Sequence, residues 1–399
     1  MSIFARASAE TGASRNPELV AFVTEPDTER TIRDLVDEEV MTFTVVRRGT
    51  VQDAIGHLRT SPSPKLLIVD ISASTMPMSD IEALADVCEP SVTVIVLGES
   101  NDIGLFRDLM NAGVADYVAK PITTELLRRT IAMRSGPAAV KPRSRTGKVI
   151  AVTGARGGVG ASTLLVNLAW LLSHRSGRKV ALVDLDLQAS SLSLMLGAEP
   201  GGGLSEALQN IDRVDDLFLD RIMQQCSDRL FLLTGHEELE DEPSLAPSAI
   251  QRIATLLTQR FHYVMLDVPR RYGPLYQHFL SLAHVRIIIA DPTLPSVRET
   301  VRVLRMTGRD DIGKRALVIL NHRCPPAKGI VSRDEFEKAI GRRIDYEIPF
   351  DRKALAAENG GIPLATEHGA ITDMLLDVSN DLSGKRSMIP NSFKRMFWS

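Results

Sequence analysis

The sequence predicts an α/β protein made of two doubly wound domains, each a parallel sheet covered by helices on both faces. Short apolar runs alternate with helical patterns along the 399-residue chain, and this alternation favours parallel strands joined by helices. The alternation is interrupted near residue 140 by a stretch rich in Pro, Gly, Ser and Arg. A chain of this length exceeds one ordinary core, and 44% apolar residues are enough to fill two.

These patterns divide the chain into five segments. We expect a disordered N-terminus over residues 1–17, a first domain over residues 18–134, a linker over residues 135–147, a second domain over residues 148–385 and a C-terminal tail over residues 386–399. The linker lacks hydrophobic periodicity and lies between two well-patterned halves, which is typical of an interdomain connection.

Composition and charge narrow the class of protein. The formal net charge is -3, so no global basic field recruits nucleic acid, although a local patch can still do so. Cys88, Cys226 and Cys324 are far apart and odd in number, which fits neither a disulfide framework nor a metal site and indicates a reducing compartment. We find no secretory apolar segment and no apolar run long enough to span a bilayer. The expected location is the cytoplasm.

The first half alternates strand-like and helical runs. The strand-like runs are Leu19–Thr24, Leu66–Asp70, Val92–Leu97 and Tyr117–Ala119, and the helical runs are Thr28–Glu39, Val51–Arg59, Asp80–Val87, Ile103–Ala112 and Thr124–Met133. This order predicts a five-stranded flavodoxin-like fold, in which loops at the carboxyl ends of the strands form any site.

Polar residues at these strand ends resemble a response-regulator receiver domain. Glu25 and Asp27 follow the first strand, Asp70 ends the third and Lys120 follows the fifth. The pattern departs from a working phospho-switch, because Gly98 stands where a Ser or Thr would read out the phosphate and a proline splits the acidic pair. We therefore favour a receiver-like domain kept as an interaction or dimerisation surface, with phosphorylation of Asp70 as the alternative.

The second half opens with a strand over Lys148–Thr153, a glycine-rich loop and a helix over Ser162–Ser173. In this context the loop N–H groups and the helix dipole favour phosphate, whereas a packing turn is the alternative reading. The candidate phosphate-binding residues are Gly157, Gly158, Val159, Gly160, Ala161, Ser162 and Thr163. Neither expected lysine is present: their places hold Arg156 and Ala161.

Carboxylates follow two other strands of this half. The strand over Lys179–Val183 runs into Asp184 and Asp186, and the strand over Tyr263–Leu266 ends at Asp267. Because parallel strands end at one edge of a sheet, we expect these carboxylates to converge with the glycine loop on one Mg²⁺-phosphate site. Aspartates that only cap helices or turns are the alternative.

Together with Asn321 at a further strand end, and Pro349 and Asp351 before a later helix, these residues resemble the MinD/ParA family of deviant-Walker ATPases. The resemblance covers roughly the C-terminal half and implies ATP and Mg²⁺ as cofactors. It implies that Ser162, Asp184, Asp186 and Asp267 surround the metal, that Asp186 orients water, that Asn321 faces adenine and that Pro349 and Asp351 border the purine pocket. It also implies a homodimer in which Arg156 takes the place of a signature lysine that reaches the other subunit's phosphates.

The two missing lysines predict ATP binding with, at most, slow hydrolysis. A charged hydrogen bond to phosphate contributes about 1.5–3 kcal/mol, so Ala161 should weaken nucleotide affinity by roughly tenfold to a hundredfold if nothing compensates. Phosphoryl transfer should suffer more, because it depends on positive charge placed against the transition state.

A receiver-like domain joined to such an ATPase half is similar to the TadZ/CpaE family, which localises the machinery for Flp-type pili at the cell pole. This resemblance implies Flp/Tad pilus-machinery proteins as partners and a place at the pole or the inner face of the cytoplasmic membrane. The tail, with Phe393, Met396 and Phe397 beside Lys394 and Arg395, favours fraying or self-docking over peripheral membrane contact. A ParA-like DNA-partitioning ATPase is the second reading, and no sequence-specific nucleic acid is expected.

Overall fold

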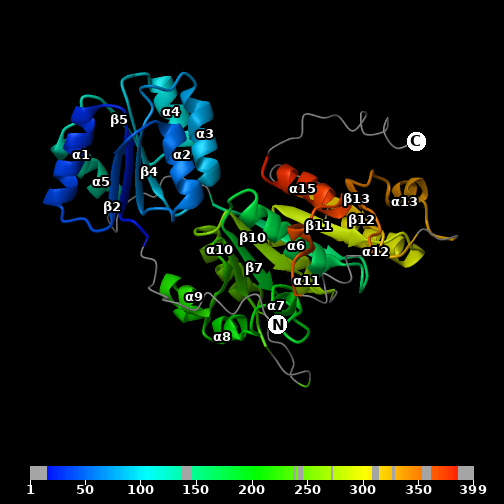
Figure 1. Cartoon of the computed structure of the whole chain (residues 1–399). Helices are drawn as coiled ribbons and strands as arrows, with labels where there is room; N and C mark the ends of the chain where they lie inside the picture. The colour runs from blue at the N-terminus through cyan, green and yellow to red at the C-terminus, as the bar shows by residue number, and fades with distance from the viewer. Residues whose placement is uncertain are drawn as a thin grey trace. The chain divides into compact units, whose positions relative to one another are not determined.

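The chain forms two compact units, Met1–Thr146 and Gly147–Ser399 (Figure 1). The computed structural model describes residues 16–135, 146–236, 240, 246–270, 273–307, 314–325, 329–352 and 361–384. The expected N-terminal segment (1–17) and linker (135–147) lie almost entirely outside the described residues, and the expected tail (386–399) lies wholly outside them. Both units are α/β folds built on a largely parallel sheet, which confirms the predicted fold class.

The first unit contains a five-stranded parallel sheet in the order β2-β1-β3-β4-β5. Its strands are β1 (Leu19–Val23), β2 (Thr44–Arg48), β3 (Leu66–Asp70), β4 (Thr93–Gly98) and β5 (Asp116–Ala119). Its helices are α1 (Pro26–Glu38), α2 (Val51–Thr60), α3 (Pro77–Val87), α4 (Ile103–Asn111) and α5 (Thr124–Ser135).

Alternate side chains of β1 pack into two separate hydrophobic cores, one on each face of the sheet. Leu19, Ala21 and Val23 pack with buried residues of α1 and α5, whereas Val20 and Phe22 pack with α2, α3 and α4. This division follows from the two-residue period of a strand, because successive side chains point to opposite faces. The helices therefore cover both faces, as Figure 1 shows for α1 and α5 against α2, α3 and α4.

The second unit contains an eight-stranded sheet in the order β13-β12-β11-β6-β10-β7-β9-β8, parallel except for β8. Its strands are β6 (Lys148–Gly154), β7 (Val180–Asp184), β8 (Gln224–Ser227), β9 (Leu230–Leu233), β10 (Tyr263–Asp267), β11 (Val285–Ala290), β12 (Arg315–Asn321) and β13 (Tyr346–Ile348). Its helices include α6 (Ala161–His174), α7 (Leu192–Met195), α8 (Gly203–Gln209), α9 (Asp216–Ile222), α10 (Pro247–Thr258), α11 (Pro274–Leu282), α12 (Leu294–Thr307), α13 (Arg333–Ile340) and α15 (Ala370–Leu382).

Helices again cover both faces of this sheet. Buried residues of α6 and α15 share one core with β6, β7 and β10, and buried residues of α10, α11, α12 and α13 share the other. The central strand β6 is hydrogen-bonded to β10 on one side and β11 on the other. In a doubly wound sheet, ligands bind outside the carboxyl ends of such central strands. Within the described part of the chain, no helix has the length and apolar character needed to span a bilayer.

Candidate functional site

The loop between β6 and α6 adopts a backbone that suits glycine at two positions. Gly158 has φ +76° and Gly160 has φ +90°, both in the left-handed region. A Cβ on Gly160 would lie 2.8 Å from Nδ2 of Asn321, so the close approach also requires glycine there. Gly160 is the N-cap of α6, whose first-turn N–H groups lack helical acceptors and favour an anion.

A cavity of about 410 Å³ opens at this loop. It is lined by Gly154, Arg156, Gly157, Gly158, Val159, Gly160, Ala161, Ser162, Thr163, Asp184, Asp186, Ala189, Ser191, Met195, Asp267, Val268, Pro269, Arg270 and Arg323. The structure therefore brings together every loop residue and every strand-end aspartate that the sequence singled out for the phosphate and metal.

The carboxylates of this cavity come from neighbouring strands. Asp184 ends β7 and Asp267 ends β10, and the two residues are register partners. Ser162, in the first turn of α6, lines the same cavity as Asp267 at the end of β10, and its side chain opposes the rise in the pKa of that carboxyl. Asp184 accepts a hydrogen bond from the hydroxyl of Ser190 at 2.7 Å and one from the amide of Asp186 at 3.0 Å.

Burial raises the pKa of both carboxyl groups above that of an exposed aspartate. Burial raises the pKa of Asp184 to about 6, and hydrogen bonds from Ser190 and the Asp186 amide oppose the rise. Burial, with the nearby charge of Asp184, raises the pKa of Asp267 to about 7. A divalent cation between them would favour the ionised form of both.

The donor set fits Mg²⁺. Mg²⁺ prefers oxygen ligands and is held by one or two carboxylates together with substrate phosphates. Ser162, Asp184 and Asp267 supply a hydroxyl and two carboxylates beside an anion-favouring loop. No group of three or more His, Cys, Asp or Glu side chains in the described ranges is arranged to hold a metal ion. The arrangement therefore suits a metal that is bound together with a phosphate group.

Arg156 is paired within its own chain. Its Nε donates to Oδ1 of Asp291 at 3.0 Å, and its Nη2 donates to the other carboxylate oxygen. Burial alone would raise the pKa of Asp291, but hydrogen bonds from Arg156, Ser296 and Thr293 outweigh it and lower that pKa. The expected reach of Arg156 toward a second subunit would require this fork to open.

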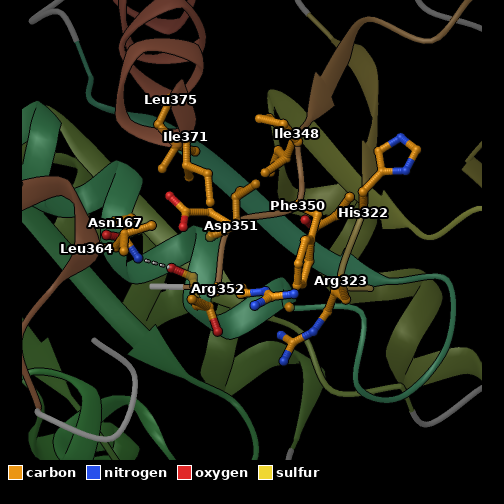
Figure 2. A pocket seen from close by; sticks show the side chains of 15 residues that line it. Asn167, His322, Arg323, Ile348, Phe350, Asp351, Arg352, Leu364, Ile371 and Leu375 are labelled. Atoms are coloured by element: carbon orange, nitrogen blue, oxygen red, sulfur yellow. Dashed lines mark hydrogen bonds between the residues drawn. The ribbon is translucent and has the colours of Figure 1, made fainter. Parts of the chain in front are cut away.

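A second cavity, of about 320 Å³, adjoins the glycine loop (Figure 2). Its lining consists of Gly160, Thr163, Leu164, Asn167, Asn321, His322, Arg323, Ile348, Pro349, Phe350, Asp351, Arg352, Leu364, Ile371 and Leu375. In Figure 2, Ile371 and Leu375 of α15 lie at the top of the cavity and Arg323 at its lower edge. Asn321, Pro349 and Asp351, the three residues expected around a purine, all lie in this lining.

Two asparagines tie the cavity walls together. The Nδ2 of Asn321 donates to the carbonyl of Val159 at 2.8 Å, which fixes the end of β12 against the glycine loop. The Oδ1 of Asn167 accepts from the amide of Ala365 at 2.7 Å, and its Nδ2 donates to the carbonyl of Thr163 at 2.7 Å. The result is an apolar slot with a few fixed polar groups, as ligand cavities generally have.

The structure adds residues that the sequence patterns did not mark. Asp291 follows β11 and holds Arg156, while Arg323 follows β12 and lines both cavities. Phe350 presents an aromatic ring to the second cavity. The position of Arg323, two residues beyond Asn321 at a strand end, is the signal that marks it.

A different polar cluster occupies the carboxyl edge of the first unit. The Nζ of Lys120 lies 2.7 Å from Oδ2 of Asp70 and 3.2 Å from Oε2 of Glu25. The hydroxyl of Thr24 donates to the same Asp70 oxygen at 2.6 Å. Burial alone would raise the pKa of Asp70, but hydrogen bonds from Lys120, Thr24 and Ser72 outweigh it and lower the pKa to about 2.

The structure corrects one part of the receiver resemblance and explains another. Asp27 lies on α1 with an exposed side chain 3.8 Å from Arg30, whereas Glu25 contacts the Lys120 ammonium that also pairs with Asp70. At Gly98, an added Cβ would lie 2.5 Å from the hydroxyl of Tyr117. A tyrosine thus occupies the space beside the position where a receiver has its Ser or Thr.

The chain is similar to several known proteins. The family model described as "ParA: NUBPL iron-transfer P-loop NTPase" matches residues 145–214. The septum site-determining protein MinD of Synechocystis sp. is 25% identical over 233 residues, which cover 55% of this chain and 82% of MinD. The ParA family ATPase from Chlorobium tepidum TLS superposes with a TM-score of 0.53 at 24% identity, over 58% of this chain and 98% of that one. The pilus assembly protein CpaE from Caulobacter crescentus CB15 is 30% identical over 29% of this chain and 92% of its own, with a TM-score of 0.27.

Proposed function

From the premise that the C-terminal unit is a MinD/ParA-like P-loop domain, we propose that it binds ATP with Mg²⁺ and dimerises in its ATP-bound form. One observation carries the proposal: the phosphate-type cavity and the apolar cavity meet at Gly160 and Thr163. A single nucleotide can therefore place its base in the second cavity and its phosphates in the first.

Each group in the site has a defined task. The first-turn amides of α6 bind phosphate, while Ser162, Asp184 and Asp267 hold the metal when it is present. When bound, Mg²⁺ would neutralise phosphate charge. Asp186, whose Oδ1 accepts from the Ala189 amide at 3.2 Å, orients water at the same edge.

Turnover is slow in this proposal. Ala161 offers no cation to the outer phosphates, and Arg156 is engaged by Asp291. Charge placed against the transition state supplies much of the catalysis in phosphoryl transfer. Nucleotide binding, rather than rapid hydrolysis, is thus the step that sets the state of the protein.

Dimerisation follows from the exposure and charge of Arg156. Its side chain is 38% exposed, so its guanidinium can exchange Asp291 for a phosphate held by a second copy of the chain. The ATP-bound dimer then presents two receiver-like units. In each unit Asp70 is already paired with Lys120, which favours an interaction surface of constant structure over a switch driven by phosphorylation.

We propose that this switch acts in assembly of an Flp-type pilus, with pilus-machinery proteins as the partners of the receiver-like unit; the joining of a receiver-like unit to a MinD/ParA-like unit supports this role. The proposed site of action is the cell pole or the inner face of the cytoplasmic membrane. A fluorescent fusion imaged beside a pilus-machinery component tests this location in the cell. Polar foci that disappear when the pilus genes are removed support it; dispersed fluorescence together with unchanged piliation on deletion overturns it. Salt-dependent binding to duplex DNA would instead favour chromosome or plasmid partitioning.

A further inference from the structure

We propose that Arg323 binds the phosphates nearest the ribose and supplies, from the end of β12, positive charge that Ala161 cannot. The inference rests on the proposed function, because it concerns how the same site holds its nucleotide. It assigns a binding role to a residue outside the glycine loop.

The placement of Arg323 carries the argument. Arg323, Gly160 and Thr163 line both the cavity of about 410 Å³ and the cavity of about 320 Å³. We call the first the phosphate cavity and the second the base cavity, after the parts of the nucleotide proposed to occupy them. A group that borders both the base cavity and the phosphate cavity lies where the ribose and its first phosphates must pass. Figure 2 shows the Arg323 side chain at the edge of the base cavity, and its Nη1 would lie 3.1 Å from a Cβ built on Gly160.

The surrounding backbone fixes this position. Asn321 is anchored to the loop by its 2.8 Å hydrogen bond to the carbonyl of Val159. Its neighbour His322 donates its amide to the carbonyl of Ile348 at 3.0 Å, which keeps the chain in register with β13. Arg323 therefore leaves a braced strand end directly beside the N-terminus of α6, where backbone N–H groups already favour an anion.

The other two arginines of the phosphate cavity, Arg156 and Arg270, are not in the lining of the base cavity. Arg156 is held by both oxygens of Asp291. Arg270 lies 3.7 Å from Glu299, a side chain that is 1% exposed. Arg323 differs from both because it also borders the base cavity. Its guanidinium fork suits two phosphate oxygens.

Equilibrium titrations of the full chain with ATP, ADP and adenosine, in the presence of Mg²⁺, test the assignment. A charged hydrogen bond contributes about 1.5–3 kcal/mol, so Arg323→Gln should weaken ATP and ADP by roughly tenfold to a hundredfold. Adenosine, measured by competition against a fluorescent ADP, should bind as before. Ala161→Lys in the Arg323→Gln chain should restore most of the lost affinity.

Arg175→Gln is the matched control. Arg175 is exposed at the C-cap of α6, so this change removes the same charge from the far end of the same helix, about 20 Å away. It should leave all three affinities unchanged. Because Arg323 is exposed, its variant should keep the wild-type thermal midpoint, and Arg323→Lys should retain part of the affinity.

The outcomes separate the two claims. If the wild-type chain is folded and binds neither ATP nor ADP at millimolar concentration, the proposed function fails. If the wild-type chain binds both and Arg323→Gln binds both equally well, the assignment of Arg323 fails while nucleotide binding stands. Loss of ATP affinity alone, equal loss for adenosine, or a loss that appears in Arg270→Gln and not in Arg323→Gln would also overturn the assignment.

Discussion

Asp184 and Asp267 lie opposite one another on β7 and β10, and both line one cavity with Ser162 of α6. Burial raises the pKa of both carboxyls, to about 6 and about 7. Two neighbouring buried acids destabilise the folded chain once both are ionised, and a bound cation relieves that cost. In the proposed function, this pairing lowers the stability of the metal-free protein and provides two carboxylates for Mg²⁺.

Asp267→Asn should therefore stabilise the nucleotide-free protein at pH 8 and impair its response to Mg²⁺. The folded pKa of Asp267 exceeds the 3.8 of an exposed carboxyl, so its contribution to stability is highest below pH 3.8 and falls as pH rises toward about 7. Asn carries no charge, and we expect a gain on the order of 2 kcal/mol at pH 8. Urea unfolding at pH 8 measures the gain.

Asp228→Asn provides the control, because Asp228 is exposed in the turn between β8 and β9. It should change stability by less than about 0.5 kcal/mol. Mg²⁺ should strengthen ATP binding by the wild-type chain and by Asp228→Asn, but not by Asp267→Asn. If Asp267→Asn is less stable than wild type and its ATP affinity still rises with Mg²⁺, Asp267 neither lowers the stability nor holds the metal.

Gly160→Ala should disrupt the glycine loop. Its backbone is left-handed and its Cβ would meet the Asn321 amide at 2.8 Å, so both strain and a clash result. We expect a loss of stability of about 1–3 kcal/mol and at least tenfold weaker ATP binding. Calorimetric titration and thermal unfolding check this.

Gly157→Ala is the paired comparison in the same loop. A Cβ there meets nothing within 4 Å, and φ of Gly157 is not in the left-handed region. This variant should keep the wild-type melting temperature. Equal melting temperatures for the two variants would contradict the backbone argument.

Asp70→Asn should destabilise the first unit without removing a phosphorylation site. The change leaves the buried ammonium of Lys120 with Glu25 as its remaining carboxylate, and removing one partner of a buried ion pair costs about 3–5 kcal/mol when nothing replaces it. Because Glu25 remains, we expect about 2–3 kcal/mol, read from faster hydrogen exchange in β1 and β3. The wild-type chain should stay unmodified in acetyl phosphate, and a phosphorylated Asp70 would contradict this.

The ion pair between Asp70 and Lys120 also predicts how the free energy of unfolding falls at acidic pH. The folded pKa of Asp70 is about 2 against 3.8 in the unfolded chain, so its contribution is complete above pH 3.8 and is lost as pH falls toward 2. Unfolding followed by circular dichroism at several pH values should show a shallower loss between pH 4 and 2 in Asp70→Asn than in wild type. Parallel curves for the two proteins would exclude this role.

Much of the fold could be predicted from the sequence because buried parallel strands give unbroken apolar runs, as in Leu66–Asp70 and Tyr263–Asp267. The sequence patterns did not identify strand β2 (Thr44–Arg48), because it is an edge strand whose Arg47 and Arg48 are exposed. Likewise, the short antiparallel strand β8 (Gln224–Ser227) has no fully buried residue.

The site was predictable wherever a residue type and a strand end coincide, as at Asp184, Asp267 and Asn321. Pairing partners were not, because contacts between residues far apart in the chain depend on how the strands are ordered. Arg156 and Asp291 are 135 positions apart, and nothing local to either marks their ion pair. Arg323 lines both cavities from the end of β12, and the place of β12 beside β11 in the sheet is not written in the local sequence.

Calorimetric titration of the full chain with ATP in excess Mg²⁺ tests the central claim most directly. The account predicts one saturable site per chain that is half-filled below about 1 mM ATP and weakened by Gly160→Ala. A folded protein that shows no saturable ATP binding at several times that concentration would contradict it.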